Sequence, residues 1–367
     1  MVPKVSLDNP APPTTPVFFN GAAATNRDIS VAITEAAEGK TFCDSMAGVG
    51  ARGVRVANEV EGVAEVFLVD LNTRSLDVAR RSASLNRVKS KCEFVLGDAS
   101  SFLFSRYGRD MKFDCVDVDP FGSPIRHVPA AVSSTSPRGI LSLTATDAAV
   151  LCGVYPEVAK RRYGASSLNN HFHHETGIRI LLNAVRRTAA SMDIGISPVA
   201  AHSTRHYLRV YVRVSPGATQ ADTSLQNEGY IAWCYSCGEL SASRSPPPPS
   251  CSACGKRVRV AGPLWIGKLA DDDLVQRAVL EARRRGAKEA ERTLLSILGV
   301  DRFPPWGFSV ERVCSSLAIP SVSEARVRTA LLEQGYDSMA QPFETRGLKT
   351  AAPASVVRDA VKASRVD

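Results

Sequence analysis

FDCVDVDPFGSP, residues Phe113–Pro124, places a carboxylate, a rigid kink and an aromatic ring at the point where an apolar run ends. The run up to Val118 has the composition of a buried strand, and Asp119-Pro120-Phe121-Gly122 follows it directly. The stretch therefore predicts a sheet strand whose end carries side chains for chemistry.

The surrounding sequence alternates short β-rich runs with helical stretches from about Lys40 to Val214. The β-rich runs are TFCDSMA, VAEVFLVD, KCEFVLGD, FDCVDVD and GILSLTA, and the helical stretches between them include VGARGVRVANEV and SLDVARRSASLN. This rhythm is typical of an α/β fold with a mostly parallel sheet and helices on both faces. Farther on, HETGIRILLNAVRRTAASM predicts an amphipathic helix, and HYLRVYVRV predicts a strand with alternating faces.

The chain of 367 residues is too long for one ordinary hydrophobic core, so we expect two domains. The first, residues 1–215, would hold the α/β sheet and an N-terminal arm. SPGATQADTSLQNEG has the composition of a polar linker. The second, residues 226–367, would be a smaller α+β domain that includes a cysteine module at 230–262.

The charge balance favours a polyanionic partner. The chain has 45 Lys and Arg against 37 Asp and Glu, a formal charge of +8, and its arginines cluster in VARRSASLNR, AKRRYG, AVRRTA and EARRRGAK. A solvated helix face explains any single cluster, but their recurrence favours nucleic acid. There is no run of about eighteen apolar residues, and the proline-rich start lacks the apolar core of a signal peptide, so we expect a cytoplasmic protein without a membrane partner. The sequence indicates no obligate protein partner.

Three successive predicted strands end in an aspartate. In DSMAGVGARG, Asp44 precedes a glycine-containing turn that opens a helix, where a polar ligand could approach the backbone. Asp70 is placed to bind the two hydroxyls of a ribose, and Asp98 with Ala99 could contact an adenine edge. For each aspartate alone, capping the next helix is an equal alternative. The ordered set favours a ligand that contains adenosine.

The sequence pattern of the glycine turn is interpreted as not matching the GxGxxG dinucleotide fingerprint, and a GxxxxGK[ST] phosphate loop is absent. Together these interpretations argue against NAD and ATP. They favour S-adenosylmethionine, which has a ribose and an adenine but no phosphate.

Asp119 is the candidate catalytic residue. An exocyclic amine on a base is a poor nucleophile, and a carboxylate that accepts its N–H hydrogen bond orients the nitrogen lone pair toward a methyl carbon. Pro120 would stiffen the turn, and Phe121 could stack on a flipped base. The alternative is an Asx-type turn with Phe121 in the core, and the preceding methyl-donor site favours the catalytic interpretation.

These residues resemble the tRNA guanine-26 N2-dimethyltransferase family. The resemblance lies in VFFNGAAATNRDISVAI, DSMAGVGARGVRVANE, VDLN, DVDPFGSP, LTATDAAVLCGVYPEVAKRRYGA, HYLRVYVRV, GPLWIGKL and GLKTAAP, which together span nearly the whole chain. It implies a Rossmann-like class I methyltransferase domain and tRNA as the partner. It also implies that S-adenosylmethionine gives one and then a second methyl group to the exocyclic N2 of guanine 26.

The resemblance further implies roles for single residues. At the cofactor it places Arg27, Arg52, Asp70, Asp98 and Ala99. Asp119 would be the catalytic carboxylate, with Phe121 and Phe18 near the target guanine. An arginine near the cofactor can pair with the methionine carboxylate. For Phe18, an N-terminal arm packed on the core is an equal alternative.

Four cysteines form a metal-binding pattern. Cys234-x-x-Cys237 and Cys251-x-x-Cys254 are separated by 13 residues, and a glycine follows each second cysteine. Four thiolates can surround a tetrahedral Zn²⁺ at about 2.3 Å each, with no open position, which predicts a structural zinc ribbon. The other five cysteines are expected to be reduced core residues. HFHHE, His171–Glu175, is not expected to bind metal, because adjacent helical histidines point to different faces and an i, i+4 pair is absent.

Two alternative functions remain. The same DPF chemistry could methylate an rRNA guanine or adenine N6, and a protein of this kind could bind RNA through its zinc module without turnover.

Overall fold

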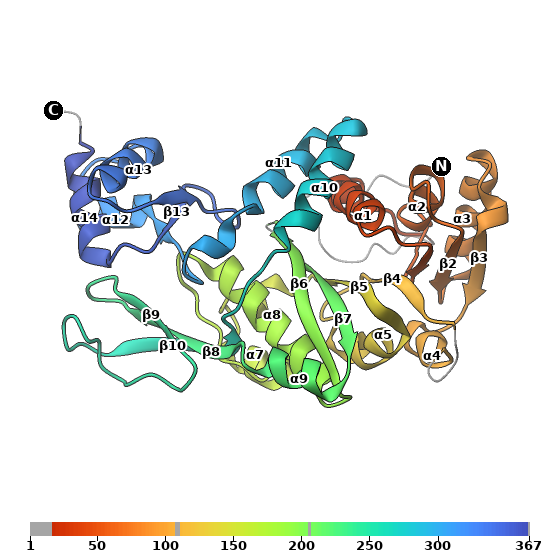
Figure 1. The fold of residues 1–367 in the computed structure, drawn as a ribbon, viewed down its shortest axis with the longest axis horizontal. Helices are drawn as coiled ribbons and strands as arrows, with labels where there is room; N and C mark the ends of the chain where they lie inside the picture. The colour runs from red at the N-terminus through yellow and green to blue at the C-terminus, as the bar shows by residue number, and fades with distance from the viewer. Residues whose placement is uncertain (1–16, 107–110, 205–206, 366–367) are drawn as a thin grey trace.

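The computed structural model describes residues 17–106, 111–204 and 207–365 and gives an elongated molecule with three sheets (Figure 1). The proline-rich start lies outside the described residues. Among the helices that are described, none is both long and apolar enough to cross a membrane.

The largest sheet has seven strands in the order β3-β2-β1-β4-β5-β7-β6. They are β1 Thr41–Asp44, β2 Glu65–Asp70, β3 Cys92–Leu96, β4 Phe113–Val118, β5 Thr135–Ala145, β6 Ile194–Ser203 and β7 Leu208–Pro216. The first five strands pair in parallel, and β7 runs antiparallel to β5 and β6. Strand order reverses between β1 and β4, which creates the switch point where open α/β sheets bind ligands. The predicted α/β class with a mostly parallel sheet is confirmed.

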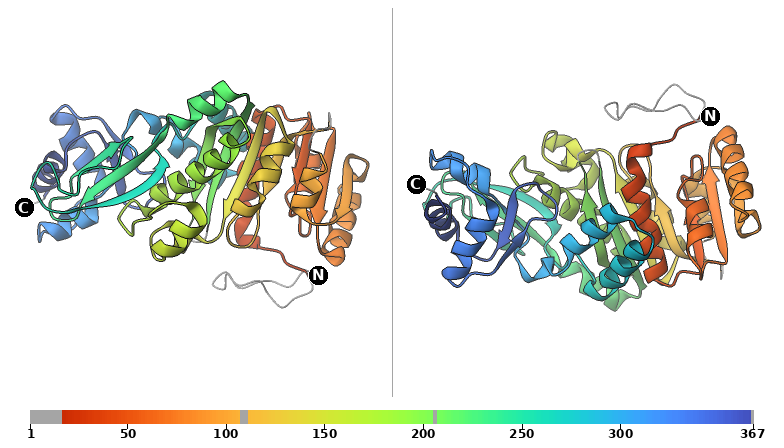
Figure 2. Two further views of the ribbon diagram at one scale, coloured as in Figure 1. Left: turned by 90° about the horizontal axis from the view of Figure 1, so that it is seen from below. Right: turned by 90° about the horizontal axis from the view of Figure 1, so that it is seen from above.

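Helices cover both faces of this sheet (Figure 2). One face carries α1 Ala24–Ala36, α2 Gly53–Glu59, α3 Thr73–Leu85, α10 Asp272–Arg284 and α11 Lys288–Ile297. The other carries α4 Ala99–Phe104, α5 Val128–Ser134, α8 His173–Ala190 and α9 Ala218–Leu225, with α6 Ala148–Leu151 and α7 Pro156–Tyr163 at the end of α8. The core therefore fills the two layers between the sheet and its helices.

Two further sheets lie at the other end of the molecule (Figure 1). The antiparallel ribbon consists of β8 Glu228–Cys234, β9 Leu240–Ser243 and β10 Val258–Trp265, and β10 packs on α8. The third sheet consists of β11 Phe308–Ser309, β12 Ser338–Ala340 and β13 Gly347–Thr350, accompanied by α12 Val310–Ser316, α13 Glu324–Glu333 and α14 Ala354–Ala363. The boundaries 1–215 and 226–367 stay a prediction. Within the second segment, α10 and α11 pack on α1 and β6 of the large sheet.

The predicted polar linker is wrong in part, because its middle forms α9. This helix packs on β6, and its Ala221 and Ser224 are buried. The packing is close enough that a Cβ at Gly195 would come within 2.3 Å of the Gln220 carbonyl oxygen. The hydrophobicity pattern did not predict this helix, because the residues on its buried face are small and weakly hydrophobic or polar.

The alternation predicted for HYLRVYVRV is also wrong in the described strand β7. Leu208 to Val212 are all buried, because β7 lies between β5 and β6 and helices cover both of its faces. On one face, Tyr211 reaches Ser30 of α1 across 3.2 Å between the two hydroxyl oxygens. The polar members of the strand are therefore core residues.

Candidate active site

Four neighbouring strands, in the spatial order β3-β2-β1-β4, are each followed by or end in an aspartate at the same edge of the sheet. These residues are Asp98, Asp70, Asp44 and Asp119. Parallel strands bring their carboxyl ends to one edge, so residues up to 75 positions apart in the sequence become neighbours. The structure thus brings the predicted cofactor residues and the predicted catalytic residue to one edge.

The turn between β1 and α2 depends on its glycines. Gly48 and Gly50 have φ of +53° and +73°, and a Cβ at Gly50 would lie 2.7 Å from the Cβ of Ala79. Gly50 therefore serves close helix packing as well as the turn. Gly48, Gly50 and Gly53 also have the G-x-G-x-x-G spacing, so the sequence-based argument against NAD from a missing fingerprint was wrong.

Asp70 closes this turn from the next strand. Its Oδ2 accepts the Gly48 N–H at 2.7 Å, and its Oδ1 accepts the Asn72 N–H at 2.8 Å. A carboxylate has about four acceptor positions, so each oxygen can accept one more hydrogen bond. The backbone around it therefore fixes the orientation of the Asp70 carboxylate, and its contact with the hydroxyls of a ribose stays a prediction.

Asp98 and Ala99 start α4. Asp98 is exposed and caps this helix, since its Oδ1 accepts the Ser101 N–H at 2.8 Å. The Ser101 backbone hydrogen bond holds the pKa of Asp98 below its usual value. Ala99 is buried. The helix-capping interpretation of Asp98 is thus observed, and its contact with an adenine stays a prediction.

Asp44 lies deeper than its partners, with 3% of its surface exposed. Its Oδ2 accepts the Gly53 N–H at 3.0 Å, which fixes the start of α2. Burial, followed by the charge of Asp117, raises the pKa of Asp44 to about 7. Asp44 therefore holds the end of the glycine turn in place through its hydrogen bond to Gly53.

Asp119 stands at the surface of this edge with 29% of its side chain exposed. The following turn is held by Thr146, whose hydroxyl accepts the Gly122 N–H at 2.6 Å and whose N–H donates to the Gly122 oxygen at 2.9 Å. Pro120 is buried, which leaves the turn little freedom. The carboxylate is therefore presented to solvent from a rigid support.

Phe121 and Phe18 form an open aromatic pair beside Asp119. Phe121 has 57% of its surface exposed, and its ring lies 5.0 Å from the ring of Phe18 in an edge-to-face arrangement. The alternative that Phe121 belongs to the core is wrong. With Phe121 exposed and Phe18 half-buried, the pair offers a stacking surface for a flat ligand two residues along the chain from the Asp119 carboxylate.

The two predicted arginines are near this edge, with different partners. Arg52 is 6% exposed, and its Nη2 lies 2.5 Å from Oδ2 of Asp119 while its Nε lies 3.2 Å from Oδ1 of Asp117. Arg27 donates from Nη1 to the Asn20 oxygen at 2.9 Å and stacks on Phe19. Burial, followed by the charge of Arg52, lowers the pKa of Arg27. Contact of either arginine with a cofactor stays a prediction.

Sequence reasoning missed the buried charges behind Asp119. Asp117, 1% exposed, pairs with both Arg52 and Arg209, and Arg209 is fully buried. Arg209 also donates to the Tyr211 hydroxyl at 2.8 Å. An aspartate two residues before Asp119 in an apolar strand was the available signal, since positions 117 and 119 share a face.

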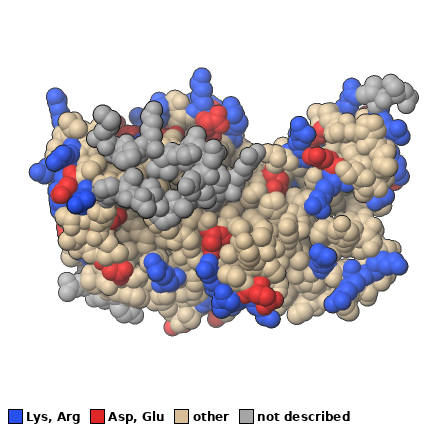
Figure 3. Space-filling model, turned by 180° about the vertical axis from the view of Figure 1, so that it is seen from behind, with Lys and Arg blue, Asp and Glu red and all other residues tan. Residues whose placement is uncertain are grey.

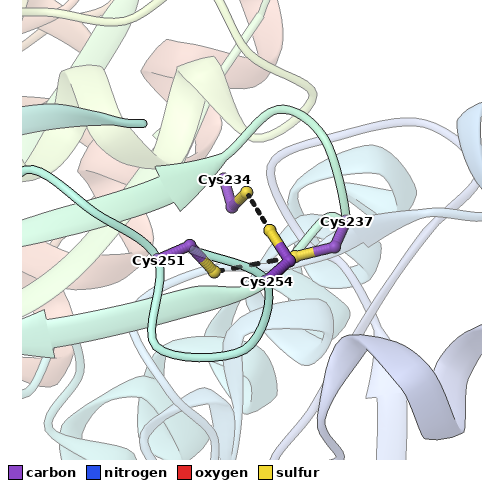
Figure 4. A group of neighbouring side chains, drawn as sticks. All are labelled: Cys234, Cys237, Cys251 and Cys254. Atoms are coloured by element: carbon purple, nitrogen blue, oxygen red, sulfur yellow. Dashed lines mark hydrogen bonds between the residues drawn. The ribbon is translucent and has the colours of Figure 1, made fainter. Parts of the chain in front are cut away.

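The four predicted metal ligands meet at the tip of the ribbon (Figure 4). Their sulfur atoms lie within 4.8 Å of one another, with 3.5 Å between Cys234 and Cys254 and 3.7 Å between Cys237 and Cys251. Each knuckle closes through a glycine with positive φ, Gly238 at +82° and Gly255 at +69°. Four convergent thiols fit a tetrahedral Zn²⁺ with no protein position left open.

The HFHHE histidines depart from the sequence-based expectation. The rings of His173 and His174 lie 4.3 Å apart instead of on different faces, because they begin α8 and no earlier turn restricts them. Nδ1 of His173 is 2.7 Å from the Asn170 oxygen, which confirms local hydrogen bonding there. His171 packs edge-on against Trp233 of the ribbon.

The fold and this edge define a class. An open α/β sheet with a glycine turn and a row of carboxylates at its switch point belongs to the Rossmann-like enzymes that bind nucleosides, here the S-adenosylmethionine-dependent methyltransferases. Within that class, the chain belongs to the N2,N2-dimethylguanosine tRNA methyltransferase family, whose model matches residues 4–362.

Individual members of this family are similar to the chain over almost its full length. A tRNA (guanine(26)-N(2))-dimethyltransferase from Methanobrevibacter smithii is 32% identical over 358 residues, covering 95% of this chain and 91% of that protein. One from Methanopyrus kandleri is 34% identical over 337 residues, covering 91% and 86%. The solved structure of Trm1 from Pyrococcus horikoshii with S-adenosyl-L-methionine superposes with a TM-score of 0.85 at 30% identity, covering 95% of this chain and 96% of that one.

Proposed function

We propose that this protein transfers methyl groups from S-adenosylmethionine to the exocyclic N2 of guanine 26 in tRNA, one and then a second. Family membership supports the reaction class. The observation that carries the assignment is the Asp119 carboxylate, partly exposed beside the Phe18–Phe121 pair and next to the edge formed by Asp70 and Asp98. A base amine and a nucleoside methyl donor can meet at that edge.

The glycine turn and the row of carboxylates would hold the methyl donor. Asp70, fixed by two backbone N–H groups, would accept from the ribose hydroxyls, and Asp98 with the buried Ala99 would border the adenine. Arg27 in the first turn of α1 carries the positive charge that a methionine carboxylate needs. S-adenosylmethionine supplies an electrophilic methyl group on a sulfonium sulfur.

Asp119 would orient the guanine amine. Oδ2 takes part in the pair with Arg52, which fixes the carboxylate and leaves Oδ1 to accept an N–H from N2. Methyl transfer would form the N2–methyl bond and break the sulfur–methyl bond of the donor, and the N2 proton that is hydrogen-bonded to Oδ1 would pass to that oxygen. Phe121 and Phe18 would stack on the base, which must leave its own stack to reach this edge. After the first transfer, N2 still has one N–H for a second cycle.

Basic side chains outside this edge support binding of tRNA. Figure 3 shows Lys and Arg spread over this face of the molecule, including the end that holds the ribbon and the C-terminal helices. In residues 240–262 of the ribbon, four basic residues and no acidic residue occur, all four exposed: Arg244, Lys256, Arg257 and Arg259. Zinc at the four cysteines would keep this surface folded, because so small a ribbon has little core of its own.

The test is Asp119→Asn, assayed with bulk tRNA and labelled S-adenosylmethionine followed by nucleoside analysis. We expect the rate of methyl transfer to fall about 100- to 10,000-fold, with cofactor affinity within a few-fold of wild type, because the amide cannot take the N2 proton. Asp359→Asn, on the exposed face of α14, is the matched control and should keep full activity. Near-normal turnover of Asp119→Asn would remove the assignment.

The products of the wild-type reaction separate the alternatives. N2-methylguanosine and N2,N2-dimethylguanosine at position 26 support the proposal. Methylated adenine N6, or methylation of rRNA in place of tRNA, would assign the same site to another substrate. Binding of tRNA without any methyl transfer would leave a zinc-containing RNA-binding protein.

A further inference from the structure

A second group of metal-type ligands lies away from the ribbon, where three distant parts of the chain meet. Cys152 directly follows α6, His173 and His174 begin α8, and Glu344 lies in the connection between β12 and β13. The sulfur of Cys152 and one nitrogen of each histidine ring lie within 4.8 Å of one another. The proposed methyl-transfer mechanism uses none of these residues.

The two rings are arranged as metal-binding histidines are. Nδ1 of His173 lies 2.7 Å from the Asn170 backbone oxygen, and Nδ1 of His174 lies 2.9 Å from Oε2 of Glu344. Both oxygens accept, so each Nδ1 carries the hydrogen and each Nε2 keeps its lone pair. A histidine that binds metal almost always donates its other N–H to a carbonyl or a carboxylate in this way.

The backbone holds this group together by close packing. A Cβ at Gly153 would lie 2.2 Å from the backbone nitrogen of Asn169, so the chain after Cys152 touches the segment that leads into α8. A Cβ at Gly177, one turn after His173, would lie 3.2 Å from the Cβ of Leu151. The two contacts fix Cys152 against the first turn of α8, so the donors converge because of the fold.

The members of the group are buried to different degrees. Cys152 is 7% exposed, while the side chains of His173, His174 and Glu344 are 31%, 19% and 11% exposed. A thiolate with two imidazoles is a donor set that suits Zn²⁺. Bonds of about 2.0–2.3 Å place tetrahedral ligands about 3.5 Å apart, so side-chain rotations that bring the donors about 1 Å closer would complete the site.

We propose that Cys152, His173 and His174 bind a second Zn²⁺ through Sγ and the two Nε2 atoms, with water in the fourth position and Glu344 orienting His174. Binding converts the Cys152 thiol to a thiolate and releases its proton. The ion joins α6 to α8, and Glu344 extends the connection to the C-terminal sheet. Thr146, which holds the turn after Asp119, lies two residues before α6, so an ion bound after α6 would anchor the chain close to that turn.

Metal content of the full-length protein tests the proposal. The chain is saturated with Zn²⁺, freed of loose metal by gel filtration and measured by mass spectrometry of the element. We expect two zinc equivalents per chain for wild type, one for Cys152→Ala, and two for the control Cys92→Ala, which removes a half-buried cysteine elsewhere. Equal zinc content in wild type and Cys152→Ala overturns the proposal, whatever the ribbon holds.

Cobalt gives an independent readout that does not depend on counting. The ribbon supplies four thiolates and the second site one, so the spectrum of Co²⁺-loaded wild type minus that of Cys152→Ala should show a tetrahedral ion with a single sulfur-to-cobalt band. His173→Gln, at the most exposed ligand, should lose the same component while its circular dichroism matches wild type. A difference spectrum without that component also overturns the proposal.

Discussion

Asp117 is the residue at which the buried charges behind the proposed catalytic residue Asp119 converge. Two guanidinium groups, from Arg52 and Arg209, share its carboxylate, and Arg52 continues to Asp119. A buried charge is tolerated when it is paired, so the three inner residues fix one another. Asp119 is thereby positioned from the core while its own carboxylate stays partly exposed.

His202 gives this region a dependence on pH. Its ring is buried near Tyr211. Burial, then the charges of Arg209 and Arg52, lower the pKa of His202 to about 3. An unfolded histidine titrates near about 6.5, so below that pH the unfolded chain binds a proton that the folded chain does not. The stability that comes from keeping His202 neutral is fully present above about pH 6.5, and it is lost as the pH falls toward 3.

His202→Phe should remove this acid-side loss. Chemical denaturation at several pH values would show wild type losing about 1.4 kcal/mol per pH unit more than the variant between about pH 6 and pH 4. Between pH 7.5 and 8.5 the two stability curves should run parallel. Parallel curves over the whole range would contradict the lowered pKa.

Local signals explain which site residues could be predicted. Asp44 and Asp70 end their strands and Asp119 directly follows its strand, and the carboxyl ends of parallel strands meet at one edge by topology alone. The pairs Arg52–Asp119 and Asp117–Arg209 join positions 67 and 92 residues apart. A single sequence holds no signal for which buried arginine meets which aspartate, because that depends on packing.

At the scale of elements, α8 connects the parts of the molecule. Its pattern correctly predicts a helix, yet its polar face is buried too. Arg179 donates to the backbone oxygens of Trp265 and Gly267 at 3.1 and 3.0 Å. The Glu175 carboxylate lies 2.7 Å from Nζ of Lys349 on β13. The amphipathic pattern predicted packing against one partner, whereas α8 packs on the large sheet and the ribbon and is joined to the C-terminal sheet by the Glu175–Lys349 pair.

Lys349→Met tests this connection. Glu175 and Lys349 are both fully buried. Burial acts to raise the pKa of Glu175, but the charges of Lys349 and Arg179 hold this pKa below its usual value. Removing one partner of a buried pair costs about 3–5 kcal/mol of unfolding free energy. Lys362→Met, in an exposed pair with Asp359, should change it by about 0.5 kcal/mol or less. Equal urea midpoints for the two variants would contradict the role of the buried pair.

At the scale of the whole molecule, the active edge and the basic ribbon are separate features of one elongated body (Figure 1). The ribbon and β3 lie toward opposite ends, and the proposed catalytic edge belongs to the half of the large sheet formed by β3, β2, β1 and β4. A tRNA bound to both would span from the stacking pair to the ribbon. Under the proposed function, the ribbon contributes affinity and the sheet contributes chemistry.

A triple variant in which Gln replaces Arg244, Lys256 and Arg257 separates the ribbon's contribution to tRNA affinity from the sheet's contribution to methyl transfer. Each lost phosphate contact lowers the slope of log K against log salt by about 0.7–0.9, so the triple variant should reduce that slope for tRNA by about two to three. At saturating tRNA its rate of methyl transfer should match wild type, because Asp119 and its support are unchanged. The matched control replaces Arg81, Arg87 and Lys89, equally exposed near β3 at the other end. If both triples weaken tRNA binding equally in filter-binding titrations at several salt concentrations, attraction by net charge explains the affinity and the ribbon has no special role.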